Sequence, residues 1–121
     1  MSAQEIMRTE LENLIPTADE IYDDGFLRVE HRNYYVACGG VALKLPRTEF
    51  LIFSRLVRTP DRIVTSDDLW TSVWATNKPL NSESLHVYIY RLRAKLAGFG
   101  LQIETMVNVG YRLITRENRF S

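Results

Sequence analysis

The feature that most constrains this chain is segment 82–97, whose aliphatic residues recur at helical spacing. At 100° per residue the apolar positions fall in one narrow stripe, and they are Leu85, Ile89, Leu92 and Leu96. Asn81 or Ser82 is suited to cap the start of such a helix, and Gly98 and Gly100 are suited to end it. The spacing therefore predicts a helix that buries one seam against a core.

The opposite face of this helix combines charged residues with a valine and a tyrosine, which is unusual for a face that only contacts water. The residues on this face and its flanks are Glu83, Ser84, His86, Val87, Tyr90, Arg91, Arg93 and Ala94. An arginine can bond guanine O6 and N7, a valine can meet a thymine methyl, and a serine can contact a base edge or a phosphate. From the residues alone, two interpretations stay open: a helix that lies in a DNA major groove, and an ordinary amphipathic helix with two stray apolar residues.

The charge of the chain is unevenly distributed. The 121 residues have a formal net charge of zero, yet residues 1–40 carry eight acidic against three basic side chains, a local charge of −5. Residues 41–121 carry twelve basic against seven acidic side chains, a local charge of +5. Such asymmetry is typical of a basic binding body with an acidic arm, although two differently solvated surfaces would give the same pattern.

Several classes of protein are disfavoured. No apolar run approaches the roughly 20 residues that cross a bilayer, and no secretory signal opens the chain, so we expect a cytoplasmic protein without a membrane span. Cys38 is the single cysteine and is expected to be a small buried hydrophobe. His31 and His86 fall in different predicted elements, and neither metal-ligand spacing nor a glycine-rich phosphate loop occurs. We therefore expect no enzymatic activity, no cofactor and no metal.

Before segment 82–97 the pattern alternates between helix and strand signals. Residues 3–15 predict a short amphipathic helix that Pro16 ends. From Gly25 onward, β-prone runs separated by turn residues predict an antiparallel meander, with the runs at 26–30, 34–38 and 41–45. Pro46 opens a helix that ends before Thr59.

A second helix follows a short connector or strand at 62–65. Thr65 and Asp68 resemble a capping box, and the helix they start carries Leu69, Trp70, Val73 and Trp74. Segment 75–82 is a polar loop. After segment 82–97, Ile103, Thr105 and Val107 alternate, an Asn108-Val-Gly110 turn follows, and Tyr111-Arg-Leu-Ile closes a predicted C-terminal hairpin.

The order of elements and two particular motifs resemble a known family. Segment Val87-Tyr-Ile-Tyr-Arg-Leu-Arg-Ala-Lys-Leu96 and strand Gly110-Tyr-Arg-Leu113, with Leu45-Pro-Arg-Thr-Glu-Phe upstream, resemble the OmpR/PhoB-type winged-helix DNA-binding domain of bacterial response regulators over about residues 26–115. The resemblance implies an α+β fold, a winged helix-turn-helix with an N-terminal four-stranded antiparallel sheet, three helices and a C-terminal β-hairpin wing. We accordingly expect an acidic arm with a short helix at 1–25 and the winged-helix domain at 26–121.

The resemblance also implies a function. It predicts sequence-specific binding of double-stranded DNA by a transcriptional regulator, with helix 82–97 in the major groove and wing 103–114 at the backbone or the minor groove. By this likeness the base-reading residues are Ser84, Val87 and Arg91. The expected contacts to the DNA backbone, or supports for them, are Trp74, Tyr88, Tyr90, Arg93, Lys95, Thr105, Tyr111 and Arg112. Loop 75–82 is where many members of the family contact RNA polymerase.

The sequence departs from the family pattern at several positions of the predicted recognition helix and wing. Glu83 stands where an arginine is frequent, His86 replaces a customary acid, and Val107 occupies a wing position often held by an arginine. A winged helix that serves as a protein-interaction module is therefore the alternative function. No receiver domain precedes the meander here, so we expect a standalone regulator or an excised effector domain. Helix 3–15 could fold onto its own sheet or form a homodimer.

Overall fold

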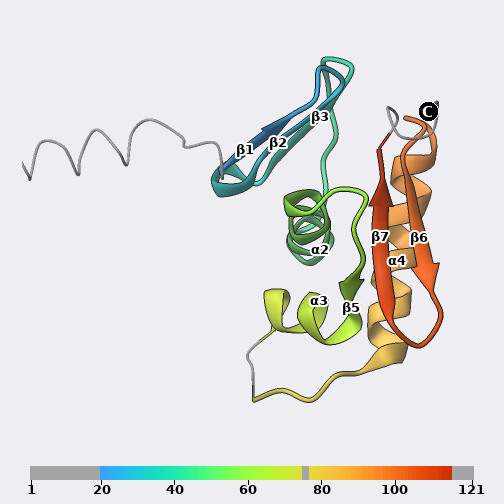
Figure 1. Ribbon diagram of the computed structural model, residues 1–121. Helices are drawn as coiled ribbons and strands as arrows, with labels where there is room; N and C mark the ends of the chain where they lie inside the picture. Colours follow the sequence, from blue (N-terminus) through green and yellow to red (C-terminus); the bar gives the residue numbers. More distant parts are fainter. Residues whose placement is uncertain (1–19, 75–76, 116–121) are drawn as a thin grey trace, which may run out of the picture. The chain divides into compact units, whose positions relative to one another are not determined.

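The computed structural model describes residues 20–74 and 77–115, which belong to two compact units (Figure 1). The sheet unit lies within residues 1–43, and the helical unit lies within residues 44–121. The predicted helix at 3–15 lies outside the described residues, so the predicted division into an arm at 1–25 and a domain at 26–121 stays a prediction. No helix among the described residues is long and apolar enough to cross a membrane.

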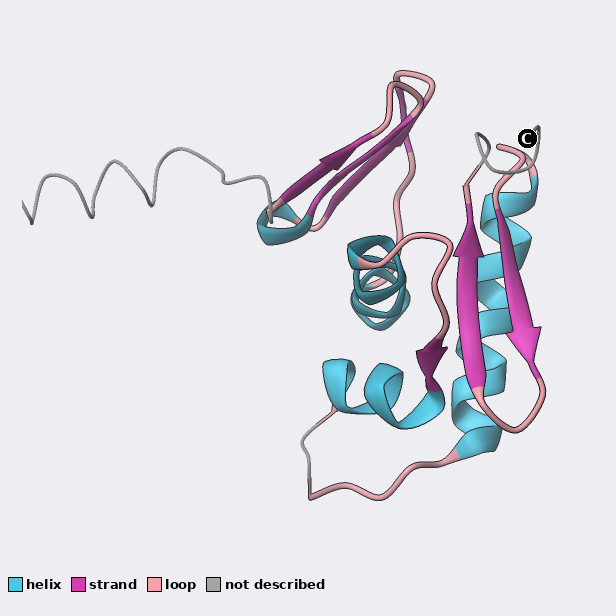
Figure 2. Cartoon of the chain, viewed as in Figure 1, coloured by secondary structure: helices cyan, strands magenta, loops and turns pink. Residues whose placement is uncertain are grey.

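The sheet unit is a four-stranded antiparallel meander, as predicted (Figure 2). Its strands follow in sequence order and are β1 (Ile21–Asp23), β2 (Leu27–Glu30), β3 (Tyr35–Cys38) and β4 (Val41–Ala42). A 3-10 turn at His31–Asn33 joins β2 to β3 and ends at Tyr34, whose φ of 51° lies in the left-handed region. Cys38 is buried, as expected of a small hydrophobe.

Strand β1 lies ahead of the first strand that the residue pattern predicts. Its three residues show no clear alternation, and pairing across the sheet holds them in place: Asp23 lies opposite Arg28, and their side chains form a 3.0 Å ion pair. The Asp23 carboxylate also accepts a 2.9 Å hydrogen bond from the Gly25 backbone N–H. That bond first, and the Arg28 side chain second, lower the pKa of Asp23. These contacts hold β1 in the sheet, but they leave no alternating pattern in the sequence from which the strand could be predicted.

The helical unit contains the three predicted helices and the C-terminal hairpin (Figures 1 and 2). Its elements are α2 (Arg47–Arg58), β5 (Val64–Thr65), α3 (Ser66–Val73), α4 (Ser82–Ala97), β6 (Gln102–Met106) and β7 (Gly110–Ile114). Strands β5, β7 and β6 form an antiparallel sheet in that order, so the hairpin pairs with the strand that precedes α3. We call residues 102–114 the wing.

The core of the helical unit is built from one face of each helix and from the wing. The predicted seam of α4 is confirmed, because all four of its aliphatic residues are buried: Leu85, Ile89, Leu92 and Leu96. The buried face of α2 includes Phe50, Ile52, Phe53 and Leu56, and the wing adds Ile103 and Leu113. Burial of such side chains is the main stabilising contribution, at about 1.5–3 kcal/mol each.

Both predicted N-caps are formed. The Thr65 hydroxyl accepts a 3.1 Å hydrogen bond from the Asp68 backbone N–H at the start of α3. The Asn81 side chain accepts a 3.0 Å hydrogen bond from the Ser84 backbone N–H at the start of α4. Each side chain satisfies a backbone donor that the first helical turn leaves open. The start of α4 is therefore set by Asn81 rather than by Ser82.

The wing turn differs in detail from the prediction. Val107 lies in the turn rather than in a strand, and Asn108 takes the left-handed conformation with φ 64°. The Val109 N–H donates a 3.0 Å hydrogen bond to the Met106 carbonyl, which closes the turn. Gly110 already belongs to β7, where a Cβ would overlap the Val64 carbonyl oxygen of β5. The glycine is thus required by close strand approach and not by the turn.

Candidate nucleic-acid interface

The outward face of α4 is exposed, as the helical wheel predicts. Val87 is 47% exposed and Tyr90 is 73% exposed, while Arg91 is also exposed and Ser84 is half-buried. The three predicted base-reading residues Ser84, Val87 and Arg91 come from three successive turns of one helix, so they form a single strip. The polar and apolar groups that can read a major groove are therefore brought together.

Aromatic side chains flank this strip on the side of α3. Trp74, the residue directly after α3, lies with its ring centroid 3.9 Å from that of Trp70 and 5.7 Å from that of Tyr88. A hollow of about 410 Å³ opens beside the rings and is lined by Trp70, Trp74, Lys78, Pro79, Asn81, Ser84 and Tyr88. Two predicted backbone-contact residues, Trp74 and Tyr88, are thus half-buried neighbours of the strip.

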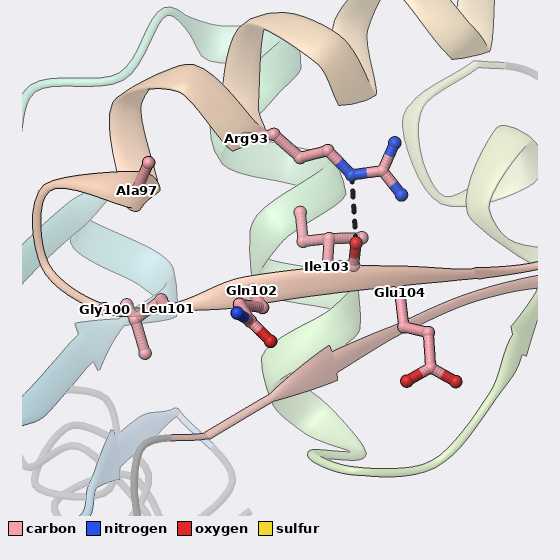
Figure 3. Close-up of a pocket in the computed structure, with 7 residues that line it drawn as sticks. All are labelled: Arg93, Ala97, Gly100, Leu101, Gln102, Ile103 and Glu104. Carbon is pink, nitrogen blue, oxygen red and sulfur yellow. Dashed lines mark hydrogen bonds between the residues drawn. The ribbon is translucent and has the colours of Figure 1, made fainter. Parts of the chain in front are cut away.

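Arg93 faces the wing rather than the solvent. Its Nε–H donates a 2.9 Å hydrogen bond to the Ile103 carbonyl of β6, drawn as the dashed line in Figure 3. Its terminal NH2 group donates a 2.6 Å hydrogen bond to the Thr105 hydroxyl. A hollow of about 490 Å³ lies beside these groups and is lined by Arg93, Ala97, Gly100, Leu101, Gln102, Ile103 and Glu104. Arg93 and Thr105, both expected at the DNA backbone, thus also bond each other.

Two further predicted backbone contacts are paired with carboxylates of the chain. The Lys95 ammonium lies 2.8 and 2.9 Å from the two oxygens of Glu49, a buried residue of α2. Arg112 lies opposite Glu104 in the wing, and their side chains form a 2.9 Å ion pair. Each of these cations therefore has an internal partner that competes with a DNA phosphate.

Tyr111 is a core residue of the wing. It is buried, and burial raises the pKa of its phenol, an effect that the nearby Arg93 guanidinium partly offsets. The Arg93 Cζ lies 6.0 Å from the Tyr111 ring centroid, and the His86 ring meets the same ring edge-on at 6.2 Å. Tyr111 therefore packs the wing against α4, and its predicted role at the DNA backbone stays a prediction.

Sequence reasoning missed two features of this surface. Trp70 was given no role beyond its place in the second predicted helix, although its spacing of four from Trp74 is a signal that the two rings can meet. The wing tip is also more apolar than Val107 alone indicates, because Met106, Val107 and Val109 are all exposed. Their common exposure depends on the turn geometry, which the pattern does not specify.

Two partner predictions involve residues outside the described ranges. Loop 75–82, predicted to contact RNA polymerase, includes residues 75–76, which the structure does not describe, while Lys78 and Pro79 line the aromatic hollow. The homodimer prediction depends on helix 3–15. Both stay predictions. Within 20–74 and 77–115, no group of three or more His, Cys, Asp or Glu side chains is arranged to hold a metal ion.

Comparison with known proteins assigns this chain to a family. The sequence profile described as "Transcriptional regulatory protein, C terminal" matches residues 40–113, which is more than half of the chain. The chain belongs to this family. It is 39% identical over 72 residues to the sensory transduction protein BceR of Halalkalibacterium halodurans, an alignment that covers 58% of this chain and 31% of BceR. It is 28% identical over 100 residues to the phosphate regulon transcriptional regulatory protein PhoB of Escherichia coli, covering 81% of this chain and 44% of PhoB.

Solved structures agree on the fold. The DNA-binding domain of Klebsiella pneumoniae RstA, solved in complex with the RstA box, matches with a TM-score of 0.67 and 26% identity over 78% of this chain and 97% of that one. The DNA-binding domain of AdeR, solved with an intercistronic region, matches in fold with a TM-score of 0.65 and 21% identity over 79% of this chain and 98% of that one. The predicted OmpR/PhoB-type winged-helix fold is confirmed. The chain spans between about a third and a half of the length of the curated relatives given above.

Proposed function

We propose that this chain binds specific double-stranded DNA sequences as part of a transcriptional regulator, with α4 in the major groove and the wing at the backbone or the minor groove. The observation that carries the proposal is the exposed strip of α4, where Val87 and Arg91 project from a helix whose opposite seam is fully buried. The relatives reported above, which include domains solved with DNA, support it.

The chemistry of the strip suits base reading. The Arg91 guanidinium can donate two hydrogen bonds to guanine O6 and N7, and the Val87 side chain can contact a thymine methyl. Ser84 lies one turn nearer the N-terminus of α4, within reach of a base edge or a phosphate. The charge of residues 41–121, which is +5, favours approach to the duplex without itself selecting a sequence.

The predicted backbone contacts divide into two groups. Trp74, Tyr88 and Tyr90 are aromatic residues beside the strip, and we assign them to phosphate or sugar contacts. The other group, which holds α4 and the wing in position through internal bonds, comprises Arg93, Lys95, Thr105, Tyr111 and Arg112. For this second group positioning is the primary role, and any phosphate contact is additional to it.

A binding-site selection followed by quantitative titration tests the proposal. The purified chain is first used to select sites from a pool of random duplexes at low salt, and wild type is then compared with Arg91→Ala on the selected site. We expect Arg91→Ala to cost about 1–3 kcal/mol of specific affinity and to relax preference at one base pair. Arg62→Ala, which removes an exposed arginine outside α4 and the wing, is the matched control and should retain the preference.

A protein-interaction module is the second candidate function. The apolar wing tip favours it, since Met106, Val107 and Val109 are exposed together and exposed apolar groups suit a protein interface. Selection that enriches no sequence, together with equal weak binding of wild type and Arg91→Ala to all duplexes, would favour this candidate and contradict the first.

A further inference from the structure

A ladder of three aromatic rings extends from the core of the helical unit to the base-reading strip. Trp70 is 3% exposed, and its Nε1–H donates a 2.9 Å hydrogen bond to the Lys78 carbonyl, so its ring is fixed. The Trp74 ring stacks on Trp70 with centroids 3.9 Å apart and an interplanar angle of 25°. The Tyr88 ring in turn lies 5.7 Å from Trp74 at 46°. Three rings, from α3, from the residue that follows it and from α4, thereby form a continuous support.

Arg91 occupies the outer end of this ladder. Its Cζ lies 5.8 Å from the centroid of the Tyr88 ring, which precedes it on α4 by three residues and so lies on the same side of the helix. A guanidinium over the face of an aromatic ring is attracted by the ring's quadrupole. An exposed arginine otherwise samples many rotamers and loses that freedom on binding. The ring therefore restricts Arg91 before any DNA arrives.

We infer that Tyr88 is a positioning residue for Arg91, with Trp74 and Trp70 as its support, and that the sequence preference of this chain depends on rings that read no base. This inference rests on the proposed function and deepens it, because it names what sets the specificity of the same strip. The Tyr88 hydroxyl and the Tyr88 ring then have separate roles: the hydroxyl can contact a phosphate, and the ring aims the guanidinium.

Two substitutions separate these roles. Tyr88→Phe removes the hydroxyl and keeps the ring, whereas Tyr88→Leu removes the ring. Affinity is measured for the selected site and for the same site changed at the base pair that Arg91→Ala identifies. We expect Tyr88→Phe to retain the ratio of the two affinities and Tyr88→Leu to reduce it by roughly two- to fivefold, the effect of one exposed cation–π contact. In an Arg91→Ala background, Tyr88→Leu should change the ratio no further.

The free protein gives an independent readout. Ring currents of Tyr88 shift the NMR resonances of the Arg91 side chain, so these should move toward random-coil positions in Tyr88→Leu and stay in place in Tyr88→Phe. Thermal melts establish that both variants fold. Trp74→Leu, which leaves Tyr88 present, should move the Arg91 resonances in the same direction by a smaller amount.

Each remaining outcome contradicts a specific statement. An unchanged ratio in Tyr88→Leu overturns the positioning role, as does an equal loss in Tyr88→Phe and Tyr88→Leu, which would assign the effect to the hydroxyl. Wild type that selects no DNA sequence contradicts the proposed function instead. In that case the Arg91 resonances of the free variants still decide whether the ladder restrains the guanidinium.

Discussion

Arg93 and Thr105 join α4 to the wing, with the arginine NH2 group 2.6 Å from the threonine hydroxyl oxygen. The same guanidinium also bonds the Ile103 carbonyl through Nε, so one planar group fixes two points along β6. A fork of this kind sets both the distance and the angle between the two elements. Because α4 and the wing contact different parts of the duplex in the proposed complex, this link sets how these two elements are placed relative to each other.

The link predicts a loss of both stability and affinity in Arg93→Lys. A lysine keeps the charge but cannot donate to both acceptors in the same plane, so we expect the free energy of unfolding to fall by about 0.5–1.5 kcal/mol for each hydrogen bond lost. The affinity for the selected site should fall with it, because the wing is less well held. Urea titration and DNA titration of the same preparations measure the two quantities.

The salt dependence of binding distinguishes positioning from direct phosphate contact. If Arg93 only positions the wing, Arg93→Lys and Arg93→Gln should both keep the wild-type slope of log affinity against log salt. A slope that is shallower by about one unit in Arg93→Gln alone would show that Arg93 also neutralises a phosphate. Thr105→Val, which removes only the acceptor hydroxyl, is the control for the hydrogen bond.

The ion pair between Lys95 and Glu49 predicts that removal of one charge lowers stability more than removal of both charges. Lys95→Ala leaves the Glu49 carboxylate buried without its cation and should lower the free energy of unfolding by about 1–3 kcal/mol. The double variant Glu49→Gln with Lys95→Met removes both charges and should recover part of that loss. Thermal melts of the single and double variants check this. Equal melting temperatures for wild type and Lys95→Ala would show that the pair contributes nothing to stability.

The elements with a regular spacing of apolar residues were predictable from the sequence, whereas the contacts between separate segments were not. The seam of Leu85, Ile89, Leu92 and Leu96 predicted that α4 is a helix and which face it exposes, because burial of one face imposes a helical period. The partners of Arg93 and Lys95 lie 10 and 46 residues away in the chain, and no local pattern encodes such contacts. The three residues of β1 escaped prediction for a different reason, because so short a strand shows no alternating pattern and is held in place by its pairing with β2.

Gly110 predicts that β7 tolerates no side chain at its first residue. A Cβ there would overlap the Val64 carbonyl oxygen and lie 2.7 Å from the Thr65 Cα, both of which are backbone atoms that cannot rotate away. We expect Gly110→Ala to lower the free energy of unfolding by at least the ~1–3 kcal/mol typical of overpacking, because β5 and β7 must separate. Urea unfolding measures the effect.

The matched control is Gly98→Ala at the end of α4. Gly98 has an ordinary helical φ of −65°, and a Cβ there would meet nothing within 4 Å. This substitution should be neutral or stabilising by about 0.4–1 kcal/mol, through reduced freedom of the unfolded chain. Similar losses in both variants would show that close strand approach is not the reason for Gly110.

Cys38 predicts a loss of stability at high pH. Burial first, and the Asp24 carboxylate second, raise the pKa of its thiol from 9.0 to about 11. Between these two pKa values the folded chain therefore binds more protons than the unfolded chain. The stabilisation that the protonated Cys38 thiol contributes is complete below about pH 9 and is lost as the pH rises towards 11. The stability difference between wild type and Cys38→Ala should shrink from about pH 8 to about pH 10.5. A constant difference would contradict the raised pKa.

Glu83 predicts a gain of affinity when its charge is reversed. Its carboxylate lies in the first turn of α4, where the helix dipole favours a negative charge by about 0.3–1 kcal/mol. In the proposed complex the same charge lies near the phosphates that the helix N-terminus approaches, where it repels them. Glu83→Arg should therefore lower the melting temperature slightly and tighten binding to every duplex alike, with a salt slope steeper by about one unit for each phosphate contact added.

The uniformity of that gain is what tests the docking geometry, because a phosphate contact carries no sequence information. Glu83→Gln, which removes the repulsion without adding a cation, should give an intermediate affinity and a smaller change in salt slope. A gain confined to the selected site would mean that residue 83 meets a base instead of the backbone. If DNA binding is established and Glu83→Arg changes neither affinity nor slope, the N-terminus of α4 does not lie at the phosphates, and α4 must enter the groove at a different angle.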